Sequence, residues 1–199
     1  MALIQNGCLL CGEYNAKHLG NKNNFEIVQC NQCNLKQVAK LPSNEELHAA
    51  YGEWSFNEKY KKDANRKVYR WLFKLLKIRF LAKGKDFLDI GCNVGFACEA
   101  ARKLGFSATG IELSNGAIRI AQEIFPKCKF YSETIQEFAK KGKKFDVVLS
   151  SEVIEHLNDV KSFIDALTSI VNKRGLLYLT TPDGGAYEHK DTFLEWNEV

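Results

Sequence analysis

The chain has 199 residues, of which 45% are hydrophobic and 26% are charged, a composition typical of a globular protein with one medium domain and a small appendage. No apolar run approaches the roughly 20 residues that cross a bilayer, which excludes a transmembrane helix. The N-terminus lacks the basic start and long apolar stretch of a secretion signal, so we expect a cytoplasmic protein.

The net charge of +4 hides an asymmetry along the chain. Residues 1–85 contain 15 Lys and Arg against 7 Asp and Glu, whereas residues 86–199 contain 13 against 17. A basic N-terminal part can meet an anionic partner such as nucleic acid, a phosphosugar or a membrane. The alternative is a lysine-rich surface that is simply solvated.

Residues 1–42 are rich in turns and contain two Cys-x-x-Cys pairs separated by 18 residues. Each pair can clamp one edge of a tetrahedral ion, and Gly12 suits the tight turn after the first pair. Because four thiolates leave no open coordination position, we expect a zinc ribbon with one structural Zn²⁺, held by Cys8, Cys11, Cys30 and Cys33. A redox dithiol or unpaired cysteines are the alternatives.

A helical linker or cap is expected over residues 43–83. Pro42 ends a strand-like run, and Ser43 or Asn44 can cap the helix that follows. The segment Lys61–Lys85 carries ten Lys and Arg, with aromatic residues and helically spaced apolar residues between them. Such a segment can bind RNA, or it can pack an apolar stripe on a sheet while its lysines face water.

An aromatic cluster of Tyr51, Trp54 and Tyr60 lies in this linker. It either covers a bound cationic ligand or packs between the two parts of the chain. Three further cysteines, Cys92, Cys98 and Cys128, are scattered through apolar segments, and we expect them to be small buried hydrophobic residues.

From residue 84 onward, short apolar strands alternate with helices, which is typical of an α/β parallel sheet with helices on both faces. The expected strands are Phe87–Ile90, Ala108–Ile111, Lys129–Tyr131, Phe145–Leu149 and Leu176–Thr180. Helical patterns are expected at 95–104, 115–125, 133–141, 153–157 and 160–172. In such sheets ligands bind at the carboxyl ends of the strands, beside the point where the strand order reverses.

A loop with two glycines, F-L-D-I-G-C-N-V-G, joins the first of these strands to its helix. Gly91 and Gly95 let the backbone pass close to a ligand. The Asp89 carboxylate can meet an ammonium group, and Glu112, at the end of the second strand, can accept both hydroxyls of a ribose. The loop is not the G-x-G-x-x-G pattern of dinucleotide sites, which disfavours a nicotinamide cofactor.

Four segments resemble the fingerprint of the class I S-adenosylmethionine-dependent methyltransferases: L-D-I-G-C-N-V-G, G-I-E-L-S, F-D-V-V-L-S-S-E-V-I-E-H-L and T-T-P-D. With the C-x-x-C-G and L-P-S-N-E-E-L-x-x-x-Y leader, the chain resembles bacterial small-molecule members, which often act on sugars, surface polysaccharides or quinone precursors. This resemblance implies a Rossmann-like doubly wound sheet over residues 84–199.

The resemblance also implies individual roles. The methionine part of the cofactor would lie against Asp89, Gly91, Cys92, Asn93 and Gly95. The ribose would lie against Glu112 and Leu113, and the adenine between Glu133 and Thr134. Ser150, Ser151 and Glu152 would face the sulfonium and the substrate. Asn93 replaces the usual middle glycine, which Asn can do because it tolerates left-handed backbone angles.

Glu152, Glu155 and His156 have the spacing of one face of a helical turn. We expect His156, with Glu152, to act catalytically, because transfer to a hydroxyl benefits from a base near neutral pH. The alternatives are a divalent metal site and a structural role for His156.

We therefore expect methyl transfer to a small hydroxylated acceptor, such as a sugar or nucleotide sugar. RNA methylation and a zinc-anchored cofactor-binding module without activity are the alternatives. The family sheet has seven strands and this sequence ends after the fifth, so we expect an incomplete sheet and poor turnover. No pattern indicates an oligomeric state.

Overall fold

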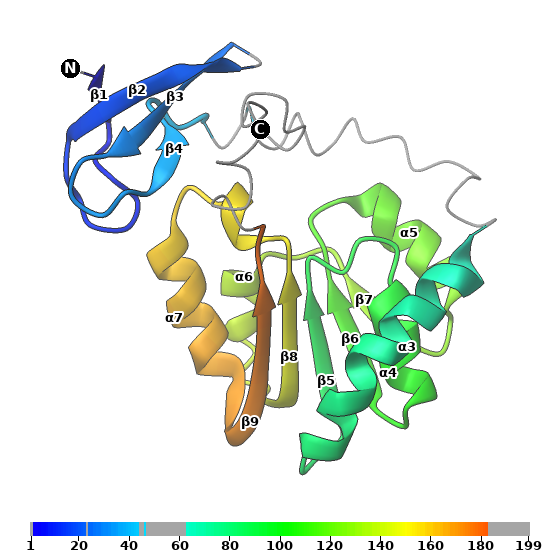
Figure 1. Cartoon of the computed structure of the whole chain (residues 1–199). Coiled ribbons are helices and arrows are strands. Elements are labelled where there is room, and N and C mark those ends of the chain that lie inside the picture. Colours follow the sequence, from blue (N-terminus) through cyan, green and yellow to red (C-terminus); the bar gives the residue numbers. More distant parts are fainter. Residues whose placement is uncertain (1, 23, 44–45, 47–62, 183–199) are drawn as a thin grey trace. The chain divides into compact units, whose positions relative to one another are not determined.

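The computed structural model describes residues 2–22, 24–43, 46 and 63–182 (Figure 1). The chain divides into two compact units: the first comprises Met1–Glu46 with Asn158–Val160 and Pro182–Val199, and the second comprises Leu47–Leu157 with Lys161–Thr181. Ser43 and Glu46 exchange hydrogen bonds between side chain and backbone N–H, the capping box expected where Ser43 starts a helix. The predicted aromatic cluster of Tyr51, Trp54 and Tyr60 lies outside the described residues.

The first unit is a four-stranded antiparallel sheet in the order β1-β2-β3-β4. Its strands are β1 (Ala2–Leu3), β2 (Asn15–Lys22), β3 (Phe25–Cys30) and β4 (Lys36–Val38). The buried residues of its core are Ile4, Cys8, Ala16, Val28, Cys30 and Ala39. Such a small core gives little hydrophobic stabilisation, so this unit depends on other cross-links.

The second unit contains a five-stranded parallel sheet in the order β7-β6-β5-β8-β9. Its strands are β5 (Asp86–Ile90), β6 (Ser107–Ile111), β7 (Lys129–Tyr131), β8 (Phe145–Ser151) and β9 (Val171–Thr180). The chain adds strands outward from β5 on one side and then returns to place β8 on the other. The strand order therefore reverses between β5 and β8, where open α/β sheets bind ligands.

Helices cover both faces of this sheet, as predicted (Figure 1). They are α3 (Ala64–Leu81), α4 (Phe96–Lys103), α5 (Asn115–Ile124), α6 (Ile135–Ala139) and α7 (Val160–Ile170). Alternation along the strands makes two cores: Val147 and Leu149 pack with α3, α4 and α5, whereas Val148 packs with α6 and α7. None of the described helices is both long and apolar enough to cross a membrane.

Several predicted boundaries differ from the structure, most of all the start of β9, which is Val171 and not the predicted Leu176. The last helix ends at Ile170, because Val171 already pairs with Phe145 at the start of β9. The helix predicted at 133–141 is shorter, since Thr134 caps it and only Ile135–Ala139 is helical. The helix predicted at 153–157 is a three-residue 3-10 turn, Ile154–His156.

Candidate functional site

The loop between β5 and α4 turns sharply at the carboxyl end of the sheet. Gly91, Asn93 and Gly95 all have left-handed backbone angles, with φ of 70°, 49° and 82°. The N–H groups of Gly91 and Cys92 both donate to the carbonyl of Ile111, at 2.9 and 3.0 Å. The end of β6 thereby holds the start of the loop, and Asn93 adopts the conformation that the sequence predicts for it.

Packing requires both glycines of this loop. A Cβ atom at Gly91 would lie 2.5 Å from Cγ2 of Val153, and one at Gly95 would lie 2.6 Å from Cζ of Phe130. Both distances are far below van der Waals contact, and both positions also need a positive φ. The loop therefore reaches its conformation only with glycine at these positions.

The Glu112 carboxylate, just after β6, is held by three backbone N–H groups. Its Oε2 accepts from Asn93 at 3.1 Å, and its Oε1 accepts from Leu113 at 2.7 Å and from Ser114 at 3.1 Å. A carboxylate offers about four acceptor sites, so these bonds leave about one free, on Oε2. The geometry thus has room for one direct ribose hydroxyl, where the sequence suggested two.

Asp89 lies near the end of β5 with only 4% of its surface exposed. Burial raises the pKa of this carboxyl to about 8. The hydrogen bond from the Cys98 thiol opposes this rise, and the negative charge of Glu112 adds to it. The Cys98 thiol donates to Oδ2 at 3.7 Å. The buried carboxyl has a thiol partner and no ion pair with any described residue, an environment that an ammonium group would complement.

Cys92, Cys98 and Cys128 are buried, as expected. The sequence did not indicate the contact of Cys98 with Asp89, which spans nine residues and forms only when α4 packs on β5 and β6. A Cβ atom added at Gly110 of β6 would lie 2.6 Å from the Cys92 sulfur and 2.9 Å from the Cys98 sulfur. A glycine on β6 thus lets both thiols pack behind the loop.

Polar side chains gather at the carboxyl ends of β8 and β9. Ser150 is 1% exposed, and its hydroxyl has no hydrogen-bond partner among the described residues. The Ser151 and Thr180 hydroxyls lie 2.8 Å apart, and Thr180 donates to Glu152 Oε1 at 3.0 Å. Sequence reasoning named Ser150, Ser151 and Glu152 as site residues but not Thr180, which follows Glu152 by 28 residues.

The expected common helical face of Glu152, Glu155 and His156 is wrong. Glu152 has φ of 57° and precedes the 3-10 turn, and its N–H donates to the Thr180 carbonyl at 3.0 Å. Thr181 donates to Glu155 Oε2 at 3.2 Å, and burial raises the pKa of Glu155. In the described part of the chain these three side chains do not gather as a group of metal ligands, and the divalent-metal alternative stays an untested hypothesis.

Glu133 and Thr134, the predicted adenine neighbours, follow β7. Thr134 caps α6 through a capping box with Glu137, in which Glu137 N–H donates to the Thr134 hydroxyl at 3.1 Å. Glu133 forms an ion pair with Lys141. Both residues therefore lie at the carboxyl edge of the sheet, where β6 and β5 separate β7 from β8. Their contact with adenine stays a prediction.

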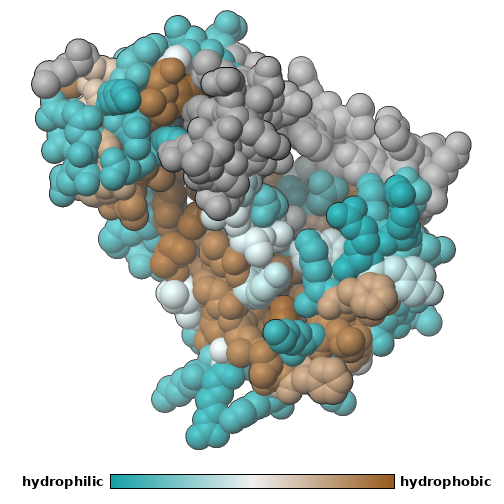
Figure 2. Space-filling model, viewed as in Figure 1, coloured by the Kyte–Doolittle hydropathy of each residue, from teal (hydrophilic) through white to brown (hydrophobic). Residues whose placement is uncertain are grey.

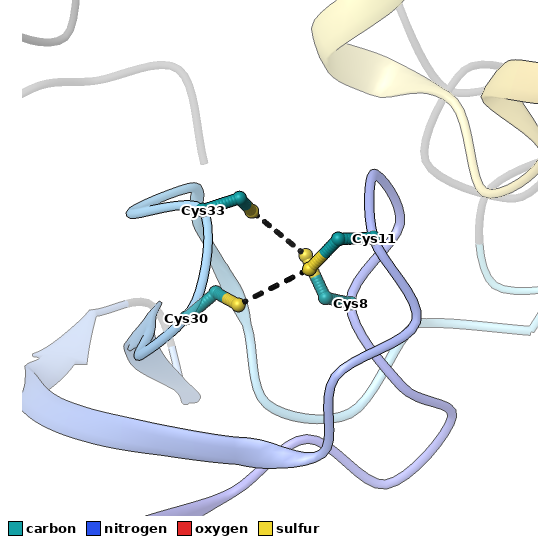
Figure 3. Close-up of side chains that lie close together, drawn as sticks. All are labelled: Cys8, Cys11, Cys30 and Cys33. Carbon is teal, nitrogen blue, oxygen red and sulfur yellow. Dashed lines mark hydrogen bonds between the residues drawn. The ribbon is translucent and has the colours of Figure 1, made fainter.

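Four cysteine thiols meet in the first unit (Figure 3). Cys8 and Cys11 come from the loop after β1, and Cys30 and Cys33 come from the end of β3 and the turn after it. The same hydrogen bond closes the turn of each Cys-x-x-Cys pair. The Gly12 N–H donates to the Cys8 carbonyl at 2.9 Å, and the Asn34 N–H donates to the Cys30 carbonyl at 3.1 Å. Gly12 and Asn34 are both left-handed, with φ of 77° and 62°.

The sulfur positions fit a tetrahedral ion. All four lie within 4.8 Å of one another, with 3.5 Å between Cys8 and Cys33 and between Cys11 and Cys30. Zn–S bonds of about 2.3 Å place tetrahedral sulfurs about 3.8 Å apart. No disulfide joins the four thiols. This group can hold Zn²⁺ as four thiolates.

Comparisons with known proteins identify the family of the chain. A family model described as a methyltransferase domain matches residues 60–198, more than half of the chain. A ubiquinone biosynthesis O-methyltransferase of Pelagibacter ubique is 31% identical over 170 residues, which cover 76% of this chain and 66% of that protein. One of Brucella ovis is 36% identical over 103 residues, which cover 50% of this chain and 42% of that protein. The chain thus spans between 42% and 66% of these two relatives.

A solved structure has the same fold. It is the plantazolicin methyltransferase BpumL in complex with a pentazolic desmethylPZN analog and SAH. The TM-score is 0.53 at 21% sequence identity, and the match covers 72% of this chain and 62% of that one. The expected Rossmann-like methyltransferase fold is confirmed.

Proposed function

Because the chain belongs to the class I S-adenosylmethionine-dependent methyltransferases, we propose that it binds this cofactor where β5 and β6 end and transfers its methyl group to a hydroxyl of a small molecule. One observation carries the proposal. The Gly91 loop and the Glu112 carboxylate lie side by side and are joined by the hydrogen bond from Asn93. This arrangement offers close backbone approach and an acceptor for a ribose hydroxyl.

Two orphaned groups support the fit of the cofactor. The Asp89 carboxyl lies buried without an ion-pair partner among the described residues, and the methionine part of S-adenosylmethionine carries an ammonium group that would supply one. The Ser150 hydroxyl is buried and lacks a hydrogen-bond partner in the described chain. When bound, the cofactor supplies an electrophilic methyl group on a sulfonium.

The residues of this chain would act by position and by proton transfer. Glu112 and the Gly91 loop would fix the cofactor, and holding donor and acceptor at near-attack distance provides most of the rate in such displacements. The hydroxyl acceptor loses a proton as it is methylated. His156, in the turn after β8, is our candidate to accept that proton, with Glu152 contacting the acceptor.

The names of the relatives support a hydroxyl acceptor, since both are called O-methyltransferases. Within this class we propose a sugar-like or nucleotide-sugar acceptor on the basis of the sequence resemblance. The names of these two relatives, which refer to ubiquinone biosynthesis, make a hydroxylated ring compound the second candidate.

We also propose that the first unit binds one structural Zn²⁺ through its four cysteines. The sulfur spacing and the two matched turns support this assignment. A closed thiolate set leaves no position for substrate, so the ion would hold the fold of residues 2–43 and take no part in methyl transfer.

The test is an acceptor panel. The full chain is incubated with S-adenosylmethionine and with nucleotide sugars, catechol-type ring compounds or RNA, and S-adenosylhomocysteine is measured by mass spectrometry. We expect product with a hydroxylated small molecule, and loss of product in Glu112→Ala but not in Asp165→Ala, an exposed carboxylate on α7. Absence of cofactor binding, or methylation of RNA alone, contradicts the proposal.

A further inference from the structure

Helix α3 presents an apolar stripe to solvent. Tyr69, Phe73, Leu76 and Phe80 are 61%, 78%, 43% and 82% exposed. Their spacing of four, three and four residues places them along one side of the helix. Scattered exposed hydrophobic residues are ordinary, but a continuous stripe that includes two phenylalanines marks an interaction surface.

This stripe is not the one that holds α3 on the protein. Val68, Leu75 and Ile78, on the opposite side, are the residues buried against the sheet and α4. The sequence suggested that the apolar residues of this helix pack inward while its lysines face water. That interpretation holds for the inner side of α3 but does not account for the apolar residues on its outer side. The outer stripe contributes nothing to the described core, so the described residues leave this side of α3 uncovered.

A basic stripe runs beside the apolar one. Arg66, Arg70 and Lys77 each precede a member of the apolar stripe by three residues. Lys74 follows Arg70 by four residues and precedes Lys77 by three, so the basic row and the apolar row are neighbours on the helix surface. All four are exposed, and no Asp or Glu occurs between Ala64 and Leu81. Figure 2 shows brown and tan apolar atoms on the visible surface over α3, with teal hydrophilic atoms beside them.

Charge narrows the choice of partner. A second copy packed through this face would bring two helices, each with six basic and no acidic residues, into contact, which like charges oppose. Single-stranded RNA would match the charge and stack on aromatic rings, but it offers nothing to Leu76 or to Leu81, which is 63% exposed. An anionic bilayer accepts both rows at once, because aromatic and aliphatic side chains enter the headgroup boundary while cations meet lipid phosphates.

We propose that α3 docks the second unit on the surface of an anionic lipid bilayer, with the stripe of Tyr69, Phe73, Leu76 and Phe80 inserted and the basic row on the headgroups. Each Lys or Arg near such a surface contributes about fivefold in affinity, from about 1 kcal/mol. This surface is independent of the proposed methyl transfer, because none of its residues belongs to the cofactor loop.

The test is co-sedimentation of the full chain with vesicles of phosphatidylcholine alone or mixed with phosphatidylglycerol. We expect binding to the mixed vesicles and little to the neutral ones, weakening as salt is raised. The double variant Phe73→Ser and Phe80→Ser should lose at least tenfold in affinity. Leu3→Ser, at a residue 61% exposed on β1, is the matched control and should bind like the parent.

The charged row has its own variants. Arg70→Gln with Lys77→Gln should weaken binding about 25-fold, from two losses of about fivefold each, whereas Lys173→Gln with Arg174→Gln on β9 should not. No binding to anionic vesicles, or binding that survives loss of both phenylalanines, overturns the proposal. Tight RNA binding without vesicle binding assigns the face to RNA. A dimer that only the phenylalanine variant abolishes assigns it to a second copy.

Discussion

The N–H of Asn93 donates to the Glu112 carboxylate at 3.1 Å, and this bond connects the loop after β5 with the end of β6. Asn93 presents its N–H toward Glu112 in a left-handed conformation, with φ of 49°. The same carboxylate that would receive a ribose hydroxyl therefore also fixes the loop that would surround the methionine part. Cofactor affinity and loop order would then be coupled through one side chain.

Replacing Glu112 tests this coupling. Glu112→Ala removes the charged acceptor, which should cost about 2 kcal/mol, or roughly thirtyfold in cofactor affinity. Glu112→Gln should fall between the parent and Ala, because its carbonyl can still accept from backbone N–H groups while its amide cannot. Calorimetric titration with S-adenosylhomocysteine measures both. Equal affinity in all three chains would show that the cofactor lies elsewhere.

A comparison of Gly91 with Gly142 separates the cost of backbone strain from the cost of a steric clash. Both have φ of 70°, but a Cβ at Gly91 would lie 2.5 Å from Val153, whereas one at Gly142 would meet nothing within 4 Å. Gly142→Ala should therefore cost only the backbone strain, about 1–2 kcal/mol of unfolding free energy. Gly91→Ala should cost more, and it should also weaken cofactor binding. Denaturant unfolding gives the comparison, and equal losses would contradict the packing argument.

Local sequence signals were enough to predict most of the second unit. Apolar runs such as Phe87–Ile90 and the glycine loop determine their conformation within a few residues, so the strands, their alternation with helices and the positions of Asp89 and Glu112 followed. The paired cysteines predicted the thiol cluster in the same way, since two Cys-x-x-Cys turns leave few other arrangements.

Features that depend on distant partners were not predictable. The left-handed Glu152 is held by the Thr180 carbonyl, 28 residues away, so its spacing to His156 looked helical in sequence. The periodicity of α3 likewise reveals apolar residues at helical spacing, but it does not tell which of two stripes faces the core. Only the packing of Val68 and Leu75 decides that Phe73 faces solvent.

Zinc removal should affect the two units differently. Metal analysis should find one Zn²⁺ per chain, and chelation should unfold residues 2–43, because their core is small and metal binding is coupled to folding there. The second unit should stay folded on its own two cores. Cys30→Ser should reproduce the loss, and Cys128→Ser, outside the cluster, should keep the metal. Limited proteolysis with metal analysis distinguishes the outcomes.

His156 is the residue to test for proton transfer. His156→Gln should lower turnover about a hundredfold, in the range that a general base contributes, while leaving cofactor affinity unchanged. His18→Gln, on β2 of the first unit and paired with Glu26, is the matched control. The pH profile of turnover adds a readout, because loss of the general base should alter that profile in the His156 variant only. An unaltered profile assigns His156 a structural role.

Asp89 should make the stability of the second unit fall as pH rises. Burial raises its pKa from the usual 3.8 to about 8 in the folded chain, so between those two pH values the folded state holds a proton that the unfolded state has lost. Stability from this group is complete below about pH 4 and declines until about pH 8, by on the order of 5 kcal/mol.

Cofactor binding should reverse this decline, because an ammonium group beside Asp89 favours the carboxylate. Binding near pH 7 should then release about one proton, and affinity should rise with pH until about pH 8. Calorimetry in buffers of different ionisation enthalpy measures the proton, and thermal unfolding across pH measures stability. Asp89→Asn keeps the shape of the side chain but cannot ionise, so both stability and cofactor affinity should depend less on pH in this variant. Asp146→Asn is the control and should leave proton release unchanged. The pKa of the Asp146 carboxyl is lowered, chiefly by the hydrogen bond from the Asp86 N–H. If Asp89→Asn keeps the full proton release, the ammonium lies against another group and the assignment of Asp89 fails.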